Sequence, residues 1–498
     1  MKKRGTTTSV VVLFFFLPPI FAALLSSDRL HSQTTARPNI VFIVADDMGH
    51  ADVAAYGGRI QTPHIDRLAT EGIRFTQAYA GNTVCAPSRS TLLTGSHMGR
   101  TPVRSNTGGV SLRPEDVTIA EVLKAAGYAT GGYGKWGLAD VGLPGAPEKQ
   151  GFDEFFGYYH QIHAHQFYPE YLYRNGERVN LPGNAGFYDG SFGGERGVGA
   201  IPAIDSATGR TRQFSHYAIV DRMKTFIRAH RDRPFFAYAP WTPPHSRYEI
   251  PADDPAWLRY KDEPWPLNAR VHAAFVAMID RHVGEVMSLL TELGIDDRTI
   301  VFFATDNGAT LEMARGPLRS NGALRGGKTT MYEGGLRVPL VARWPGRIAA
   351  GQVSRHLTYF PDVFPTLAEL AGADARVPDA VTGISLVPEL LGAKTAGRAQ
   401  DSHRYLYWED ADIDWKAVRY LHEDTLRQAV RAGDWKAYRP GPGKPLQLFN
   451  LATDPGEERD VAAANPSIVS RLESYLTEAH RPPPPQVEPE RIGGRQFR

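Results

Sequence analysis

Two apolar runs, residues 39–45 and 299–305, restrict the fold more than any other feature of the chain. Both are rich in β-branched residues and do not alternate with polar ones, which is typical of strands buried on both faces of a parallel sheet. Residues 234–240 form a third run of this kind, and the glycine-rich residues 128–133 form a weaker fourth. The sequence therefore predicts a parallel sheet inside a large core.

Segments with helical periodicity lie between these runs. They are residues 65–71, 117–126, 217–229 and 271–293. Strands that alternate with helices indicate an α/β fold, here a large, doubly wound, mostly parallel sheet flanked by helices. In such folds ligands bind beyond the carboxyl ends of the strands. That edge of the sheet is where we expect a functional site.

The pattern changes after a predicted helix at residues 360–371. Short segments at 405–408 and 429–438 predict antiparallel hairpins, and residues 468–479 predict a closing helix. We therefore expect a large domain at residues 37–375 and a smaller α+β domain at 376–481. Residues 482–498 begin with four prolines and are expected to form a flexible tail.

Residues 1–33 are predicted to be a secretory signal peptide and leader. Three basic residues precede the apolar stretch 10–25, and a polar run follows it. A transmembrane anchor is the alternative, but the stretch is shorter than the ~20 residues needed to span a bilayer, and it contains Pro18 and Pro19. We expect a secreted or periplasmic protein whose mature chain has no membrane span.

The charges of the chain nearly cancel. There are 56 Lys and Arg residues against 54 Asp and Glu residues, for a net charge of +2. Such a balance provides no overall field that would attract nucleic acid or an anionic membrane. Binding partners must therefore be recognised at a specific site, and nucleic acid is not expected among them.

Acidic pairs end the two main runs. Asp46 and Asp47 follow the first, and Asp306 and Asn307 follow the second. These side chains offer only oxygen ligands, which hard cations prefer, and a crowded carboxylate site favours Ca2+ over Mg2+. The alternative is that each pair caps the next helix or turn. Two pairs at the ends of two strands of one sheet favour the metal site.

Cys85 is the only cysteine in the chain, so it forms no intramolecular disulfide although secretion would permit one. It begins the segment CAPSRSTLLTG, in which Pro87 fits the first turn of a helix and Leu92 and Leu93 supply its buried face. A helix N-terminus attracts anions through free N–H groups and the helix dipole. The alternative is a small buried apolar residue.

The pattern Cys-x-Pro-Ser-Arg followed by Ser-Thr-Leu-Leu-Thr-Gly resembles the signature of the type I, formylglycine-dependent sulfatases. These are arylsulfatase-like members of the alkaline phosphatase superfamily. The resemblance covers most of the predicted mature chain. The other matching segments are residues 39–47, 62–69, 134–136, 244–245, 306–308, 327–335 and 448–458. It implies an alkaline phosphatase-like fold with its sulfatase catalytic domain at residues 37–375.

The resemblance also implies a cofactor and a metal site. A formylglycine-generating enzyme would oxidise Cys85 to formylglycine, and the hydrated form of that residue would attack the sulfur of a sulfate ester. Loss of a proton from the second hydroxyl would then expel sulfate. The calcium ligands that the resemblance implies are Asp46, Asp47, Asp306, Asn307 and an oxygen of residue 85.

Four further residues match positions with catalytic roles in that family. Arg89 would steady the formylglycine, while Lys135 and Lys328 would bind the sulfate oxygens and stabilise the transition state. His245 would act as general acid, a role that Lys328 would share. The alternative for each Lys and Arg is an ordinary solvated surface charge.

One departure from the family concerns residue 137. Many sulfatases have Gly-Lys-Trp-His, in which the histidine contacts the formylglycine, whereas Gly137 follows Trp136 here. His163 and His165 lie in the aromatic segment 151–173, and one of them is a candidate replacement. A sulfatase branch with a similar Gly-Lys-Trp-Gly and His-Ala-His is associated with sulfated polysaccharides. The resemblance therefore implies that these histidines are candidate substrate-binding residues for a carbohydrate sulfate of a galactose-type sugar. The alternative is that this segment serves packing.

Two rival functions remain open at this point. Phosphonate or phosphate monoester hydrolases on the same scaffold resemble sulfatases down to the Cys-x-Pro-Ser-Arg pattern. A non-catalytic, glycan-binding descendant is a rival of another class, and the presence of Cys85, Arg89 and Lys135 argues against it. The expected function is a sulfuric ester hydrolase acting on a sulfated small molecule or saccharide.

Overall fold

The computed structural model of the chain describes residues 1, 5–9, 37–106, 110–188, 199–414 and 419–484. The chain divides into two units, residues 1–36 and 37–498, and the elements below belong to the second. Most of the predicted signal peptide, at residues 2–4 and 10–33, lies outside the described residues. The same is true of residues 485–498 of the predicted tail.

A ten-stranded sheet forms the centre of the unit, in the order β13-β2-β12-β11-β1-β9-β4-β5-β6-β7. The strands are β1 (Asn39–Ala45), β2 (Ile73–Phe75), β4 (Ala129–Lys135), β5 (Glu154–Tyr158), β6 (Tyr171–Arg174), β7 (Glu177–Asn180), β9 (Phe235–Pro240), β11 (Thr299–Thr305), β12 (Leu340–Arg343) and β13 (Gln352–Ser354). The five neighbours from β11 to β5 are parallel, and antiparallel strands flank them. The predicted α/β fold with a mostly parallel sheet is confirmed.

The register of the central strands determines where the acidic pairs lie. β1 and β11 have the bounds that the apolar runs predicted, and all residues of both strands are buried. They pair in parallel from Asn39 opposite Thr299 to Ala45 opposite Thr305. Both strands therefore end level with each other, so the residues that follow them meet at one edge of the sheet.

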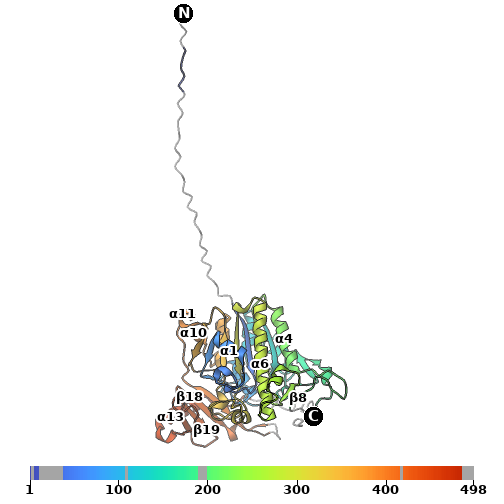
Figure 1. Cartoon of the computed structure of the whole chain (residues 1–498). Helices are drawn as coiled ribbons and strands as arrows, with labels where there is room; N and C mark the ends of the chain where they lie inside the picture. Colours follow the sequence, from blue (N-terminus) through green and yellow to red (C-terminus); the bar gives the residue numbers. More distant parts are fainter. Residues whose placement is uncertain (2–4, 10–36, 107–109, 189–198, 415–418, 485–498) are drawn as a thin grey trace. The chain divides into compact units, whose positions relative to one another are not determined.

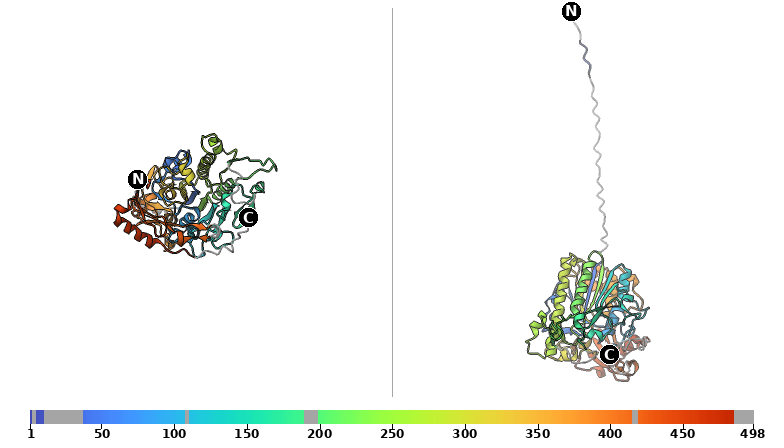
Figure 2. Two further views of the ribbon diagram at one scale, coloured as in Figure 1. Left: turned by 90° about the horizontal axis from the view of Figure 1, so that it is seen from below. Right: turned by 90° about the vertical axis from the view of Figure 1, so that its right-hand side faces the viewer.

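Helices cover both faces of the sheet. Alternate residues of β1 pack into two different cores, with Val41 and Ile43 on one side and Phe42 and Val44 on the other. The first core includes α1 (Pro63–Thr70), α4 (Ser215–Ala229) and α6 (Leu267–Glu292), which lie on the same side of the sheet (Figure 1). The second includes α2 (Cys85–Thr94), α3 (Ile119–Ala125) and α9 (Val363–Leu370). The result is a three-layer arrangement, which Figure 2 shows from two further directions.

A second, smaller sheet follows in the sequence. Its four antiparallel strands have the order β15-β18-β19-β20 and comprise β15 (Leu406–Asp410), β18 (Arg427–Ala432), β19 (Trp435–Arg439) and β20 (Gln447–Asn450). α13 (Pro466–Ala479) lies beside this sheet (Figure 1). It packs against the sheet through Leu472 and Leu476. The predicted antiparallel sheet and closing helix are confirmed, while the domain boundary at residues 375–376 stays a prediction.

Short elements complete the fold. The strands are β3 (Ala78–Tyr79), β8 (Gly199–Ile201), β10 (Glu249–Pro251), β14 (Thr358–Tyr359), β16 (Ile413–Asp414) and β17 (Arg419–Tyr420). The helices are α5 (Pro255–Tyr260), α7 (Leu311–Arg315), α8 (Glu333–Leu336), α10 (Val387–Leu391), α11 (Ala393–Ala396) and α12 (His422–Thr425). A single 3-10 turn, His163–His165, lies between β5 and β6 and bears on the site.

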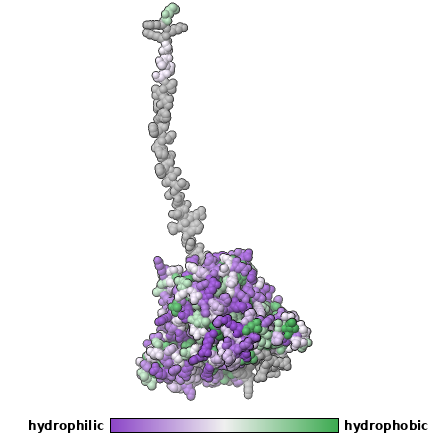
Figure 3. All heavy atoms as spheres, in the orientation of Figure 1, coloured by the Kyte–Doolittle hydropathy of each residue, from purple (hydrophilic) through white to green (hydrophobic). Residues whose placement is uncertain are grey.

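The face of the molecule in Figure 3 is mainly hydrophilic, with scattered apolar residues. Among the described residues, none of the helices combines the length and the apolar character needed to cross a membrane.

Candidate active site

Four adjacent parallel strands deliver polar residues to one edge of the large sheet. β11 leads into Asp306 and Asn307, β1 into Asp46 and Asp47, and β9 through a short turn into His245, while β4 ends at Lys135. Cys85 and Arg89 come from α2, and Lys328 comes from the loop before α8. The structure thus gathers into one cluster all the predicted catalytic and metal-binding residues.

The acidic residues of this cluster are buried and close together. The backbone N–H of Asp47 donates to Asp306 Oδ1 over 3.2 Å, and Asn307 Nδ2 donates to Asp47 Oδ1 over 2.8 Å. Asp47 has a positive φ of 66°, which is uncommon outside glycine and aims its side chain at this edge. The Oδ1 atom of Asn307 is buried and has no hydrogen-bond partner among the described residues.

Cys85 is the first residue of α2 and is fully buried. Its S–H group donates to Asp46 Oδ1 over 3.0 Å, and Sγ lies 3.7 Å from Lys328 Nζ. Asn106 Oδ1 accepts the next backbone N–H, that of Ala86, over 2.9 Å and so holds the first turn. Burial and the charge of Asp46 raise the pKa of the thiol, so it stays protonated at neutral pH.

Three cations balance the three carboxylates. Lys135 Nζ lies 2.7 Å from Asp46 Oδ2, and Lys328 Nζ lies 2.7 Å from Asp47 Oδ2. Arg89 Nε donates to Asp306 Oδ2 over 2.9 Å, and Nη1 donates to the carbonyl oxygen of Lys135 over 2.6 Å. Arg89 therefore links α2 to the ends of β11 and β4. Arg89 and Lys135 are fully buried, so neither is the ordinary solvated surface charge that was the alternative.

Lys135 lies at the end of a strand. It is the last residue of β4, and Gly134 before it has a φ of 139°. An added Cβ at Gly134 would lie 2.1 Å from the carbonyl oxygen of Pro240, so the glycine permits β4 and β9 to approach closely here.

The carboxylates differ in their electrostatic balance. Burial and the neighbouring charge of Asp46 raise the pKa of Asp306 to about 7, against the opposing effect of Arg89. Burial also opposes ionisation of Asp46, but Lys135, His245 and Arg89 hold its pKa well below the usual range. The ionised form of Asp306 is thus the least stabilised of the three carboxylates, and a further cation beside it would stabilise that form.

His245 and Lys328 form a pair beside Asp47. Lys328 Nζ lies 3.1 Å from His245 Nε2, and His245 Nε2 lies 3.4 Å from Asp47 Oδ2. Burial and the charge of Lys328 lower the pKa of His245 to about 4. Burial would lower the pKa of Lys328, but Asp47 raises it overall. At neutral pH the proton of this pair therefore resides on Lys328.

The two histidines of the aromatic segment have different surroundings. His165 stacks on His245, with ring centroids 4.1 Å apart. His163 is buried among aromatic rings, 5.1 Å from that of Tyr158 and 4.8 Å from that of Tyr171, and burial lowers its pKa to about 3. His165 thus lies against His245 of the cluster, whereas His163 packs among aromatic rings.

A cavity of about 460 Å³ opens beside the cluster. His165, His245 and Lys328 line one part of it, and Asp410 and Arg427 of the small sheet line another. The other lining residues are Val84, Asn106, Gln161, Ile162, Thr329, Ala411, Asp412 and Ile413. The volume is in the range of pockets that hold small molecules. Sequence reasoning missed the contribution of the small sheet.

Gln161 is another part of the cavity wall that sequence reasoning missed. Its Oε1 atom lies 2.6 Å from where a Cβ on Gly137 would be placed. Gly137 has a φ of 73°, so glycine suits both the backbone and the side chain that packs against it. The space beside residue 137 is therefore occupied by Gln161. The only sequence signal was the missing histidine at Gly137, which does not indicate what fills the space.

The donor set of the cluster fits a hard divalent cation. Its carboxylate oxygens and the unpartnered Asn307 Oδ1 are the ligands that Ca2+ and Mg2+ prefer. Asp46, Asp47, Cys85 and His245 each place one potential ligand atom within 4.8 Å of the others. The residues present can therefore hold a cation of this kind.

A second group of potential ligands, which we call the Glu409 cluster, consists of Glu409, His422 and His480. Glu409 accepts hydrogen bonds from Arg104 over 2.6 Å, from Tyr407 over 2.6 Å and from His480 Nδ1 over 2.7 Å. Its Oε1 also lies 3.3 Å from His422 Nε2. One carboxylate surrounded by donors has no spare acceptor for a metal ion.

Comparison with known proteins identifies several relatives. The family described as Sulfatase matches residues 38–373, and the family described as N-sulphoglucosamine sulphohydrolase, C-terminal, matches residues 327–481. Arylsulfatase A from Homo sapiens is 34% identical, over 87% of this chain and 86% of its own length. N-acetylgalactosamine-6-sulfatase from Homo sapiens is 32% identical, over 90% of this chain and 87% of its own length. The crystal structure of Ps i-CgsB in complex with k-i-k-neocarrahexaose matches with a TM-score of 0.73 at 25% identity, over 91% of this chain and 95% of that chain.

Proposed function

The chain belongs to the sulfatase family of sulfuric ester hydrolases, and from this we propose that it removes sulfate from a sulfated sugar by means of formylglycine at residue 85 and a bound calcium ion. The observation that carries the proposal is the position of Cys85. The residue lies at the start of a helix, 3.0 Å from Asp46 and 3.7 Å from Lys328, inside a buried cluster of carboxylates and cations. A buried thiol with a raised pKa is a poor nucleophile, which favours a role after oxidation.

Asp46, Asp47, Asp306 and Asn307 would hold the calcium ion, together with an oxygen of residue 85. When bound, the ion would neutralise charge on the sulfate oxygens and acidify a hydroxyl of residue 85. Three cations already pair with the three carboxylates, so the charges of these side chains cancel before an ion binds. Calcium would make the cluster positive, which suits an anionic sulfate ester.

Oxidation of Cys85 by a formylglycine-generating enzyme would supply a hydrated aldehyde, whose two hydroxyls serve attack on sulfur and later release of sulfate. Arg89 keeps α2 in place relative to the sheet through its bonds to Asp306 and to the carbonyl of Lys135. Residue 85 is thereby oriented before substrate binds, which reduces the entropic cost of reaching the transition state.

Lys135 and Lys328 flank the residue-85 side of the cluster. Each ammonium group lies 2.7 Å from a carboxylate oxygen, so its position is fixed before the substrate arrives. We assign them to bind the sulfate oxygens and to stabilise the charge that develops on them. Cations held in place in a dry site stabilise a transition state more than mobile surface charges do.

The departing alcohol needs a proton on its bridging oxygen. His245 is neutral at neutral pH because its pKa is about 4, whereas Lys328 keeps its proton. We therefore assign the acid function to the hydrogen-bonded pair of Lys328 and His245, with Lys328 Nζ as the proton source. This keeps the expectation that His245 and Lys328 share the acid role, and it names Lys328 as the proton source.

A carbohydrate is the substrate class that the surroundings favour. His165 lines the cavity beside His245, and polar side chains of the small sheet complete the wall. Among the relatives, one is named for N-acetylgalactosamine 6-sulfate and one was solved with neocarrahexaose. We propose a sulfated galactose-type sugar as the substrate and a secreted or periplasmic location. A contact of His163 with the sugar stays a prediction.

The test is release of inorganic sulfate from a monosulfated galactoside by protein made in a host with the maturation enzyme. We expect turnover by the wild type and none by Cys85→Ser, which has only one hydroxyl at residue 85. A methyl phosphonate or phosphate ester of nitrophenol is the comparison substrate. Faster turnover of that ester than of every sulfate ester would favour the phosphonate or phosphate monoester hydrolase, and binding without turnover would favour a non-catalytic glycan-binding protein.

A further inference from the structure

Three polar atoms around the active-site cavity have no hydrogen-bond partner within the part of the chain that the structure describes. They are Gln161 Oε1, His165 Nε2 and Arg427 Nε, and all three are buried. Their residues line the same cavity as His245 and Lys328. Buried polar atoms are paired in the great majority of cases, so several without partners in one cavity indicate a polar ligand.

The chemistry of these atoms limits what the ligand can be. Gln161 Oε1 can only accept a hydrogen bond, Arg427 Nε can only donate one, and His165 Nε2 does either according to its tautomer. A hydroxyl group both donates and accepts. A ring with several hydroxyls satisfies all three atoms, whereas an aryl or steryl alcohol leaves them unpaired.

We propose that Gln161 and Arg427 are specificity-determining residues, which recognise an uncharged, hydroxyl-bearing ring in the alcohol part of the substrate. This inference rests on the proposed function, because it assigns the cavity next to the sulfate site to the alcohol that is released. It extends that function by naming the residues and by restricting the charge of the ring they contact.

Gln161 is held where it can make this contact. Its side chain is only 5% exposed, and its Oε1 takes the space beside Gly137 that any larger residue would occupy. The site therefore has a fixed acceptor in a position that glycine keeps open. Such rigidity lowers the entropic cost of binding a hydroxyl.

Arg427 is held from the other side of the cavity. It is the first residue of β18 and pairs in register with Asp410, the last residue of β15. Its Nη1 donates to Asp412 Oδ1 over 2.7 Å and its Nη2 to Asp410 Oδ2 over 3.2 Å. Both terminal nitrogens are engaged by carboxylates, so Nε remains for the ligand.

The same contacts argue against a charged ring. Two carboxylates face one guanidinium, so this wall carries no excess positive charge. A second sulfate or a carboxylate on the ring would meet Asp410 and Asp412 without a free cation to balance it. The wall therefore favours neutral hydroxyls over an additional anionic group.

The experiment compares two substrates, a monosulfated methyl galactoside and nitrophenyl sulfate. Arg427→Lys keeps the positive charge but removes Nε, and Gln161→Met keeps the size but removes the acceptor. We expect each variant to lower kcat/KM for the galactoside by about tenfold, since each removes one hydrogen bond. The fall on nitrophenyl sulfate is expected to be several times smaller. Gln161→Met tests the inference without disturbing the ion pairs of Arg427.

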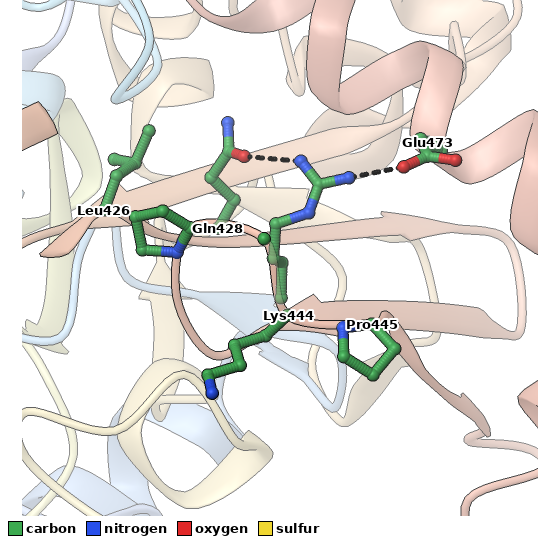
Figure 4. Close-up of a pocket in the computed structure, with 8 residues that line it drawn as sticks. Leu426, Gln428, Lys444, Pro445 and Glu473 are labelled. Atoms are coloured by element: carbon green, nitrogen blue, oxygen red, sulfur yellow. Dashed lines mark hydrogen bonds and ion pairs between the residues drawn. The ribbon is translucent and has the colours of Figure 1, made fainter. Parts of the chain in front are cut away.

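Arg439→Lys is the matched control. Arg439 lies on the adjacent strand β19 and its side chain is 22% exposed, against 23% for Arg427. It bonds to Gln428 and Glu473 and lines a different pocket (Figure 4). The ratio of the two kcat/KM values is expected to stay as in the wild type.

Equal falls on both substrates, or no fall on the galactoside, would overturn the inference while the proposed function stands. A wild type that prefers a disulfated galactoside would overturn the restriction to uncharged rings. A wild type that releases sulfate from neither substrate would instead contradict the proposed function itself.

Discussion

Within the described residues, two groups of potential metal ligands have similar residue types but opposite arrangements. In the active-site cluster, Asp46, Asp47 and Asp306 converge, and Asn307 Oδ1 has no partner in the described structure. In the Glu409 cluster, one carboxylate accepts hydrogen bonds from several donors. The active-site cluster therefore has acceptor atoms left for a metal ion, whereas the Glu409 cluster has none.

The pKa values express the same contrast. Burial and Asp46 raise the pKa of Asp306 to about 7, so its ionised form is poorly stabilised. Burial would do the same to Glu409, but His422, His480 and Arg104 lower its pKa to about 2. The balance of donors and acceptors, rather than the residue types, therefore distinguishes the candidate cation site from the ion-pair network around Glu409.

Removing one carboxylate from each cluster gives the largest expected difference. Asp306→Asn keeps the shape but lowers the charge at the cation site, so sulfate release should fall by about three orders of magnitude. Elemental analysis should find calcium lost from this variant. Glu409→Gln is the matched control and should keep both calcium and activity. Normal calcium content in Asp306→Asn, or loss of calcium from Glu409→Gln, would contradict this difference between the two clusters.

Glu409→Gln should instead lower the free energy of unfolding. The substitution leaves Arg104, whose side chain is 1% exposed, without its charged partner. An unpaired buried charge of this kind costs about 3 kcal/mol. Urea unfolding of the wild type and the variant measures the difference. Unchanged stability would mean that Glu409 is not the centre of the network.

The pH dependence of unfolding tests the lowered pKa of Glu409. Because the folded state lowers the pKa of Glu409 from 4.5 to about 2, its ionisation stabilises the fold above pH 4.5. That stabilisation, about 3 kcal/mol, is lost as the pH falls from 4.5 through 2. The wild type should therefore lose more stability than Glu409→Gln over this range. Parallel curves for the two proteins would contradict the low pKa.

Sequence reasoning predicted the parts of the site that depend on strand ends. β1 and β11 have the predicted bounds, and their parallel register brings Asp46 and Asp306 together. Cys85 begins the predicted helix, and Leu92 and Leu93 are buried as expected. These features follow from local apolar patterns and from a general rule about parallel sheets.

Other parts of the site were not predictable from local patterns. Gln161 fills space beside Gly137, and Arg427 reaches the cavity from a separate sheet. Both positions depend on how distant segments pack, and neither residue belongs to a motif. Short strands such as β12, inside the sheet, and β13, at its edge, were missed for a similar reason, since three or four residues show no clear periodicity. The aromatic segment serves mainly packing, with Phe155 and Tyr159 buried.

Calcium should stabilise the protein by a smaller amount. A ligand present at a hundred times its Kd adds about 2.7 kcal/mol to the free energy of unfolding. A calcium chelator should therefore lower the Tm of the wild type, and added calcium should restore it. Asp306→Asn should respond to neither treatment. An equal response of Asp306→Asn and the wild type would place the calcium elsewhere.

The proposed mechanism depends most on the chemical state of residue 85. Mass spectrometry of the tryptic peptide that contains it, from active protein made in a host with the maturation enzyme, distinguishes a thiol from an aldehyde. We predict the mass of formylglycine, in a fraction of the chains that rises with specific activity. An intact thiol at residue 85 in every chain of a fully active preparation would contradict the proposed mechanism.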